Sequence, residues 1–286
     1  MNRKIAVLLT CYNRKEKTRL CLSSFYKYIS SEVSYDIYMV DDGSTDGTND
    51  AIKEEFPLVN IIKGNGYLFW AGGMRLAWQT AIDSKETYDG FLLVNDDVEF
   101  LPDFWSRINE ADLYAINRYA KRGLYSSGTK SKVTGEYTYG GSILQKHPFR
   151  HRYDSVLPVE YPQKCDLVNA NILYVTDTVF DSIGMFDNRF THGGADYDYG
   201  LSAKEAGFPV LLCPHWGGFC ENDHPNVPNN QSTLKKRIKN LYSVKGFALN
   251  EYLYYLNKHF RFKAPYSFVV SWIKVLFPNF MNKSLL

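Results

Sequence analysis

The 286-residue sequence lacks an excess of charge of either sign, because 33 Lys and Arg residues nearly balance 31 Asp and Glu residues. A nucleic-acid-binding protein usually presents a strongly basic face, so this balance gives no support for a nucleic-acid partner. The sequence also lacks an apolar run of the roughly 20 residues that a membrane-spanning helix needs. Internal repeats and low-complexity segments are missing as well. The remaining composition, with 45% hydrophobic and 22% charged residues, is that of an ordinary globular protein.

Cysteine is scarce and scattered. The five cysteines form no C-x-x-C pair, and such an odd, dispersed set is typical of reduced thiols in a cytosolic compartment. The first residues, Asn2, Arg3 and Lys4, run straight into a short apolar strand, which is not the pattern of a signal peptide. We therefore expect a cytoplasmic protein, and leave open a peripheral contact of its C-terminal segment with the inner face of the membrane.

Two thiols and two imidazoles lie close together in the sequence, at Cys213, His215, Cys220 and His224. These side chains are of the types that bind zinc, but their spacing matches no common ligand pattern. We therefore favour buried free thiols over a zinc site.

Short apolar runs alternate with helical patterns over the first hundred residues. The predicted strands are 5–9, 35–40, 59–62 and 91–94, and the predicted helices include 15–29 and 74–82. This alternation indicates an α/β fold with a doubly wound sheet that is covered on both faces. Polar residues follow three of the strands, at 10–13, 41–42 and 95–97. Ligands in such folds bind beyond the carboxyl ends of the strands, so these residues predict a binding crevice.

The pattern changes after residue 100. Residues 124–175 are rich in Tyr, Gly and β-branched residues and predict short strands, with antiparallel pairing as one option. A short helix is predicted at 198–206, with Gly207 as its stop. Residues 234–260 are basic and helical in pattern, and an apolar-aromatic tail follows at 267–280.

Two acidic clusters at strand ends are open to two interpretations each. The carboxylates of Asn95-Asp96-Asp97 suit a hard cation such as Mg²⁺, which a diphosphate leaving group needs; the alternative is a solvated acidic turn. A carboxylate of Asp41-Asp42 suits a uracil or thymine N–H. The alternative there is a turn in which Ser44 caps the next helix and Asp46 lies in its first turn.

Glycine clusters at 64–66 and 71–73 would let backbone N–H groups approach a phosphate, and Arg75 would add a fixed positive fork. Their spacing is not that of the dinucleotide-binding fingerprint. Asp196, which the pattern places just before the helix at 198–206, is either a helix cap or a general base. Asp198 falls in the predicted first turn, where the helix dipole favours a negative charge and a structural role.

Four segments, in this order and spacing, resemble the family 2 glycosyltransferases with the GT-A fold, over roughly residues 4–225. They are Thr10-Cys11-Tyr12-Asn13-Arg14, Val40-Asp41-Asp42-Gly43-Ser44-Thr45-Asp46, Leu92-Leu93-Val94-Asn95-Asp96-Asp97-Val98 and Gly194-Ala195-Asp196-Tyr197-Asp198. The closest likeness is to a bacterial rhamnosyltransferase-like branch that builds cell-surface polysaccharides. The resemblance implies a GT-A type doubly wound mixed sheet flanked by helices. We expect this domain at 1–225, with a nucleotide-binding half at 1–100 and an acceptor half at 101–225, and a helical C-terminal extension at 226–286.

The resemblance also implies an activity and a set of site residues. The activity is the inverting transfer of a hexose from a UDP- or dTDP-sugar to a saccharide or lipid-linked saccharide hydroxyl, with Mg²⁺ or Mn²⁺ as cofactor. Asp196 would be the catalytic base, and Asp97 and His224 would lie at the metal. The residues implied at the nucleotide and donor are Thr10, Tyr12, Asn13, Arg14, Asp41, Asp42, Asn65, Gly73, Arg75, Asn95 and Asp96.

Three positions depart from the family pattern. Asn95 replaces the first Asp of the D-x-D metal motif, Ala195 replaces a Glu before the catalytic Asp, and Ser202 replaces an Arg on the following helix. The last two changes keep a second hypothesis open, namely a non-catalytic sugar-nucleotide or glycan-binding protein on the same fold. A nucleotidyltransferase is disfavoured, because residues 10–13 do not form the glycine-rich basic loop that such an enzyme needs.

The C-terminal segment has two candidate partners. The basic residues Lys235, Lys236, Arg237 and Lys239 precede an apolar-aromatic stretch that contains Phe268, Trp272, Ile273, Leu276 and Phe277. Such a stretch would lie in a membrane interface, or it would pack on the domain or form a homodimer with a second subunit. Packing on the domain or on a second subunit is slightly favoured from the sequence over the membrane interface.

Overall fold

The structure, a computed structural model, describes residues 3–222 and 233–278. Its strands are β1 Arg3–Cys11, β2 Val33–Asp41, β3 Val59–Lys63, β4 Gly90–Asn95, β5 Glu99–Phe100, β6 Leu124–Lys130, β7 Tyr137–Tyr139, β8 Gly141–Leu144, β9 Tyr153–Val156, β10 Gln163–Lys164, β11 Leu167–Val168, β12 Ile172–Thr176 and β13 Val210–Phe219. Its helices are α1 Lys15–Tyr28, α2 Thr48–Glu55, α3 Phe69–Asp83, α4 Phe104–Tyr119, α5 Asp177–Ile183, α6 Ala195–Glu205, α7 Leu234–Tyr242, α8 Leu249–His259 and α9 Lys263–Leu276.

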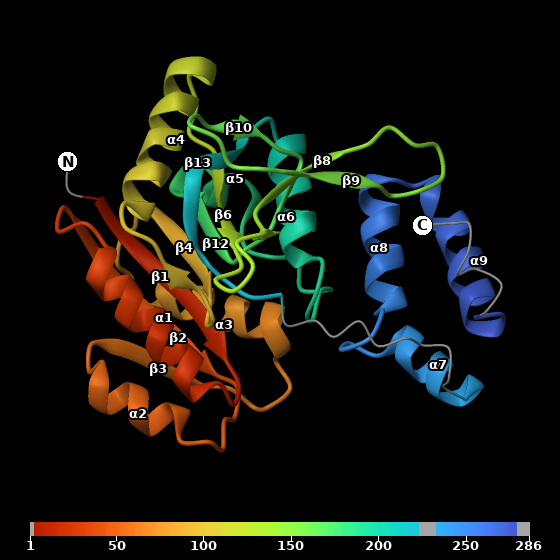
Figure 1. Cartoon of the computed structure of the whole chain (residues 1–286), viewed down its shortest axis with the longest axis horizontal. Helices are drawn as coiled ribbons and strands as arrows, with labels where there is room; N and C mark the ends of the chain where they lie inside the picture. The colour runs from red at the N-terminus through yellow and green to blue at the C-terminus, as the bar shows by residue number, and fades with distance from the viewer. Residues whose placement is uncertain (1–2, 223–232, 279–286) are drawn as a thin grey trace.

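A mixed sheet forms the centre of the molecule (Figure 1). Its strand order is β10-β13-β6-β12-β4-β1-β2-β3, with β5 beside β13 and β7 beside β6. The neighbours β4, β1, β2 and β3 are parallel, whereas β12 runs antiparallel between β4 and β6. The strands β11, β8 and β9 form a small second sheet. The expected doubly wound mixed sheet is confirmed, including antiparallel pairing within residues 124–175.

The strand β1 illustrates why apolar runs without alternation form buried strands here. Successive side chains of a strand point to opposite faces, and both faces of this sheet are covered. Ala6 and Leu8 pack in the cluster that includes α3, whereas Ile5, Val7 and Leu9 pack in the cluster that includes α1 and α4. All five are at most 2% exposed, so the sheet is a two-sided core.

The parallel strands bring the predicted polar residues to one edge. Thr10 lies opposite Val40 of β2 and Asn95 of β4, and Cys11 lies opposite Asp41. The segments after β1, β2 and β4 therefore meet at the carboxyl edge of the sheet, as expected from the sequence.

The turn after β2 differs from the prediction. Ser44 does not cap a helix, because its Oγ accepts a hydrogen bond from the Asn13 N–H at 2.9 Å. The helix α2 begins later, at Thr48, after Gly47 with φ 82°, and Asp46 accepts the Thr48 N–H at 3.0 Å. The residues between Asp42 and Gly47 instead form hydrogen bonds with the loop after β1.

The helix α6 also begins earlier than predicted. Gly194, in a left-handed conformation with φ 81°, precedes its first residue Ala195, so Asp196 and Asp198 both lie in the first turn. Its end agrees with the prediction, since Gly207 follows it with φ 78°. Residues two apart on a helix point about 200° away from each other, so the two carboxylates leave α6 on opposite sides.

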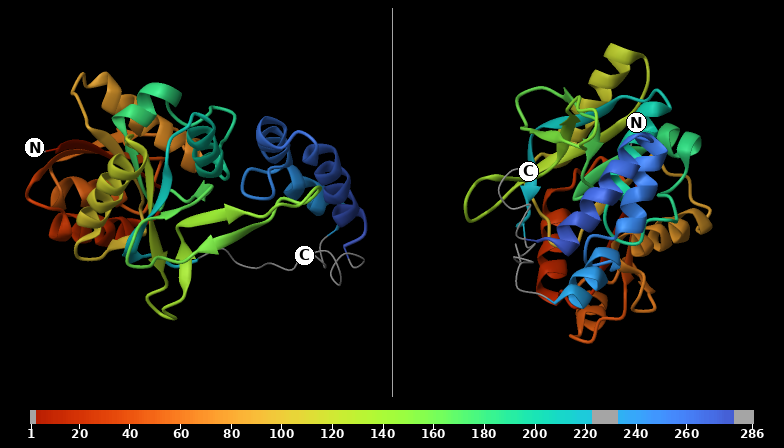
Figure 2. Two further views of the ribbon diagram at one scale, coloured as in Figure 1. Left: turned by 90° about the horizontal axis from the view of Figure 1, so that it is seen from above. Right: turned by 90° about the vertical axis from the view of Figure 1, so that its right-hand side faces the viewer.

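The helices α7, α8 and α9 form an extension beside the sheet domain (Figures 1 and 2). Contacts between α8 and the domain hold it in place: Asp198 of α6 accepts a hydrogen bond from Lys258 Nζ and pairs with His259 Nε2, both at 2.8 Å. The Tyr254 hydroxyl donates to Asp187 at 2.7 Å, and the Arg189 guanidinium lies 3.9 Å from the Tyr254 ring centroid. None of the described helices is long and apolar enough to cross a membrane.

Candidate functional site

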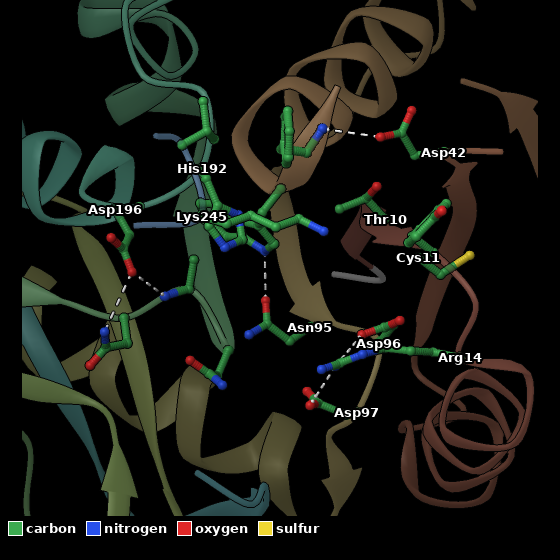
Figure 3. A pocket seen from close by; sticks show the side chains of 18 of the residues that line it. Thr10, Cys11, Arg14, Asp42, Asn95, Asp96, Asp97, His192, Asp196 and Lys245 are labelled. Atoms are coloured by element: carbon green, nitrogen blue, oxygen red, sulfur yellow. Dashed lines mark hydrogen bonds and ion pairs between the residues drawn. The ribbon is translucent and has the colours of Figure 1, made fainter. Parts of the chain in front are cut away.

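A cavity of about 1060 Å³ lies at the carboxyl edge of the sheet. Its walls come from the ends of β1 and β4, the start of α3, the segments before β12 and α6, and the loop between α7 and α8. The expected site residues that line it are Thr10, Tyr12, Arg14, Asp42, Asn95, Asp96, Asp97 and Asp196. Figure 3 shows most of these side chains around a common space. The fold therefore brings together residues that lie up to 186 positions apart in the sequence.

Three expected residues shape loops near the cavity without lining it. Asn13 Oδ1 accepts the Thr45 N–H at 2.7 Å, Asp41 Oδ1 accepts the Ser44 N–H at 2.8 Å, and Asn65 Oδ1 accepts the Tyr67 N–H at 2.9 Å. These contacts fix the backbone of the turns that carry Tyr12 and Asp42. His224, expected at the metal, lies outside the described residues.

Gly73 and Arg75, both expected at the phosphates, lie outside the lining of the cavity. A Cβ at Gly73 would clash with the Thr10 side chain, so this glycine allows α3 to pack closely on β1. The Arg75 guanidinium donates to the backbone oxygens of Phe190 at 2.7 Å and Asp187 at 3.1 Å. It therefore holds the 187–190 loop against α3, and burial lowers its pKa.

Asp42 organises the loop between β3 and α3. Its Oδ1 accepts the Gly66 N–H at 2.8 Å, and its Oδ2 accepts the N–H groups of Leu68 and Phe69 at 3.0 and 3.1 Å. A Cβ at Gly64 would meet Asp42 Oδ1 at 2.6 Å, so the glycine makes room for this carboxylate. Asp42 is 5% exposed and lines the cavity.

The carboxylates of Asp96 and Asp97 share one cation. Arg14 Nη1 donates to Asp97 Oδ2 at 2.7 Å and to Asp96 Oδ1 at 3.1 Å (Figure 3), and the Cys220 thiol donates to Asp97 Oδ1 at 3.4 Å. Burial, together with the charge of Asp97, raises the pKa of Asp96 to about 7, while Arg14 opposes the shift. Asp96 Oδ2 is buried and has no hydrogen-bond partner in the described structure.

These two carboxylates fit a divalent cation only in part. The described residues include no group of three or more His, Cys, Asp or Glu side chains that could hold a metal. Mg²⁺, however, is commonly bound by one or two carboxylates and completes its shell with water and substrate phosphates. The unsatisfied Asp96 Oδ2 and the adjacent Asp97 supply such hard oxygen donors.

Asp196 lies on the opposite wall of the cavity. Its Oδ1 accepts the Tyr197 N–H at 2.9 Å, and its Oδ2 accepts longer contacts of 3.4 Å from Asn169 Nδ2 and the Ala170 N–H. Burial raises the pKa of Asp196 to about 6, against the opposing effect of these donors. A carboxylate with a pKa near 6 is largely ionised at neutral pH and is a better proton acceptor than an ordinary Asp.

The sequence did not single out several residues of the cavity. Trp70 Nε1 donates to Asn95 Oδ1 at 2.7 Å, and Asn171 Nδ2 donates to Cys220 Sγ at 3.2 Å. Lys245 enters from the loop between α7 and α8, with Nζ 5.9 Å from the Tyr12 ring centroid and 5.8 Å from that of Phe69. It points into the cavity (Figure 3), and its Nζ has no ion-pair partner among residues 3–222 and 233–278. A lysine within a basic segment carries no sequence signal of its own.

Comparison with known proteins finds a similarity over the N-terminal part of the chain. Residues 6–117 match the family described as Glycosyl transferase family 2. This domain contains the expected donor residues from Thr10 to Asp97, so the coarse expectation of a family 2 glycosyltransferase domain is confirmed. Among curated proteins, the glycosyltransferase AglE of Haloferax volcanii is 23% identical over 82% of this chain and 71% of its own length.

Solved structures agree on the fold. The chain is similar to the mannosyltransferase PcManGT from Pyrobaculum calidifontis, in complex with GDP-Man and Mn²⁺, with a TM-score of 0.55 and 12% identity over 97% of this chain and 71% of that one. It is also similar to TarS 1–349 of S. aureus, with a TM-score of 0.54 and 13% identity over 96% of this chain and 79% of that one. A third similar structure is GalNAc-T7 with UDP, GalNAc and Mn²⁺, with a TM-score of 0.55 and 11% identity over 74% of this chain and 42% of that one. The fold is therefore the expected GT-A fold.

Proposed function

We propose that this chain is an inverting, metal-dependent glycosyltransferase that moves a hexose from a UDP- or dTDP-sugar to an acceptor hydroxyl. The observation that carries the proposal is a single cavity in which the ends of β1 and β4 face Asp196, a carboxylate whose pKa is raised by desolvation. The likeness to glycosyltransferases in complex with GDP-Man and Mn²⁺, and with UDP, GalNAc and Mn²⁺, supports it. The sequence resemblance favours a rhamnosyltransferase-like role in bacterial cell-surface polysaccharide synthesis.

In this proposal the donor lies along the carboxyl edge of the sheet. Asp42 accepts a hydrogen bond from the N–H of the base, and Thr10, Tyr12 and Asn95 line the path to the sugar. Asp96 and Asp97 would hold Mg²⁺ or Mn²⁺, which, when bound, neutralises charge on the diphosphate. Arg14 would then give up Asp97, and its guanidinium and the Lys245 ammonium would supply further positive charge to the leaving group.

The acceptor lies on the Asp196 side. Asp196 removes the proton from the acceptor hydroxyl while that oxygen bonds to the anomeric carbon. The bond from this carbon to the diphosphate oxygen breaks on the opposite face, and the nucleoside diphosphate leaves with the electron pair. Because the attack and the departure are on opposite faces, the configuration of the sugar inverts.

The test is nucleoside diphosphate release from a panel of UDP-, dTDP- and GDP-sugars, with Mn²⁺ or with chelator. We expect release with at least one UDP- or dTDP-sugar, its loss with chelator, and its loss in Asp196→Asn with donor affinity retained. Ser202→Ala is a matched control on the same helix, because the Ser202 hydroxyl is buried without a partner among the described groups. Donor binding without turnover in the wild type would instead favour a non-catalytic sugar-nucleotide-binding protein.

The departure at Ala195 has a structural explanation that is compatible with catalysis. Ala195 is 0% exposed and packs in the core cluster that includes α3 and α6, and it does not line the cavity. Its side chain therefore replaces a Glu at a position where this chain has apolar surroundings, and Asp196 remains at the cavity.

A further inference from the structure

The outermost helix of the extension, α9, is packed with small and polar residues inward. Its buried residues recur at helical spacing and are Ala264, Ser267, Ser271 and Val275. They face α7 and α8, and Arg237 of α7 donates to the Val275 backbone oxygen at 2.7 Å. A surface helix normally buries the large side chains of its apolar stripe. In α9 most of the buried positions hold small or polar residues instead, although Val275 and Trp272 also pack inward.

Large apolar side chains occupy the outside of this helix and its two ends. We call them the α9 outer face; with their exposed fractions they are Phe262 (93%), Phe268 (43%), Val269 (54%), Leu276 (46%) and Phe277 (59%). Phe262, Val269 and Leu276 are seven residues apart, so they lie on one side of the helix. Figure 2 shows α9 on the side of the extension away from the sheet. A clustered apolar surface of this kind marks an interaction site.

The extension that carries α9 has an excess of positive charge, although Lys245 enters the cavity and Lys258 pairs with Asp198 of the sheet domain. Residues 233–278 contain nine of the 33 Lys and Arg residues of the chain but one of its 31 Asp and Glu residues. That single acid, Glu251, accepts the Thr191 N–H at 3.0 Å and so faces the sheet domain. The helix α9 itself contains no acidic residue. The extension is therefore strongly basic in a chain whose net charge is only +2.

The hairpin between β8 and β9 adds further cations beside the first turn of α9. Lys263 Nζ donates to the Arg150 backbone oxygen at 3.1 Å, and the ring centroids of Phe149 and Tyr266 are 5.6 Å apart. The hairpin segment 145–152 contains Lys146, Arg150 and Arg152 and no acid. Figure 2 shows this hairpin reaching across to the extension.

We propose that the α9 outer face and the cations around it bind the surface of an anionic membrane. The aromatic and aliphatic side chains enter the boundary between headgroups and acyl chains, and the Lys and Arg side chains contact the lipid phosphates. A second copy of the chain fits this surface poorly. A two-fold interface would place the basic surroundings of one α9 against those of the other, without acidic residues to pair with them. This proposal does not depend on the proposed transferase activity.

The test is co-sedimentation of the full chain with phosphatidylcholine vesicles and with vesicles that also contain about 30% phosphatidylglycerol. We expect binding to the anionic vesicles only. The triple variant Phe262→Ser/Phe268→Ser/Val269→Ser should lose at least about tenfold in partition, and Arg150→Gln/Arg152→Gln about five-fold per neutralised cation. Leu58→Ser/Val133→Ser is the matched apolar control, since these residues are 80% and 87% exposed on the sheet domain. Lys53→Gln/Lys85→Gln, also exposed there, is the charge control.

Two results would overturn the proposal. One is equal partition of the wild type and both variants, with the melting temperatures unchanged. The other is no vesicle binding at all, together with a dimer in light scattering that the triple variant dissociates; this outcome would assign the α9 outer face to a second copy.

Discussion

Replacing Asp196 by Asn should abolish transfer and, at neutral pH, stabilise the fold. Burial raises the pKa of Asp196 from 3.8 to about 6, so the folded protein binds a proton more tightly than the unfolded chain. A raised carboxyl pKa means that the contribution of this group to stability is fully present below pH 3.8 and is lost as the pH rises through about 6. A shift of about two units corresponds to about 3 kcal/mol, and a neutral side-chain amide at this position does not carry this cost.

The substitution also loses part of the hydrogen bonding. The Asn oxygen can keep the Tyr197 N–H, but its amide group would face the donors of Asn169 and Ala170, whose contacts are long at 3.4 Å. This mismatch costs about 1 kcal/mol, which leaves a net gain of about 2 kcal/mol above pH 7. For a chain of this size that gain raises the melting temperature by roughly 4 °C.

The assay is thermal unfolding of both proteins between pH 4 and pH 8, with transfer rates measured on the same samples. The advantage of Asp196→Asn should grow from pH 4 to pH 6 and then stay constant, while turnover falls by about 10²–10⁴-fold. In the wild type, turnover should rise with pH through about 6, as the base becomes ionised. A stability difference that does not change with pH would refute the assignment of a desolvated, ionised carboxylate to this position.

Three further predictions concern other residues of the site. Asp97→Asn should remove the metal dependence of nucleoside diphosphate binding, which calorimetry with Mg²⁺, Mn²⁺ and chelator would measure; unchanged metal dependence would exclude Asp97 as a ligand. Asp198→Asn should destabilise the fold by about 3 kcal/mol, because it leaves Lys258 and His259 without their buried partner, and denaturant unfolding measures the loss. Lys245→Met should weaken binding of a nucleoside diphosphate about tenfold but leave binding of the nucleoside unchanged; an equal loss for both would point to a structural role.

The sequence predicted the parts of the site that depend on local pattern. The apolar runs that form β1, β2 and β4 are followed directly by polar residues. Because these strands are parallel neighbours, their carboxyl ends lie at the same edge of the sheet, and so do the polar residues that follow them. Local pattern was therefore sufficient to assign Asp42, Asp96 and Asp97 to the cavity.

The parts that failed depend on contacts between distant segments. Arg75 lies two residues beyond the glycines that suggested a phosphate site, but the 187–190 loop supplies two backbone oxygens that hold it away from the cavity. Ser44 was expected to cap a helix, but its hydroxyl oxygen accepts a hydrogen bond from the Asn13 N–H instead. Lys245 reaches the cavity only because the extension docks on α6, which no local pattern shows.

The docking of α8 on α6 has a consequence for how the chain can be divided. One turn of α6 presents Asp196 to the cavity and Asp198, on its other side, to Lys258 and His259. Removing the extension would take both of these partners away from Asp198, a carboxylate two residues away from the proposed base. The part of the chain that positions the proposed base therefore extends beyond the glycosyltransferase-like motifs. A protein in which the extension is removed or replaced needs another cationic side chain beside Asp198. Without one, we expect the helix that positions Asp196 to be disturbed.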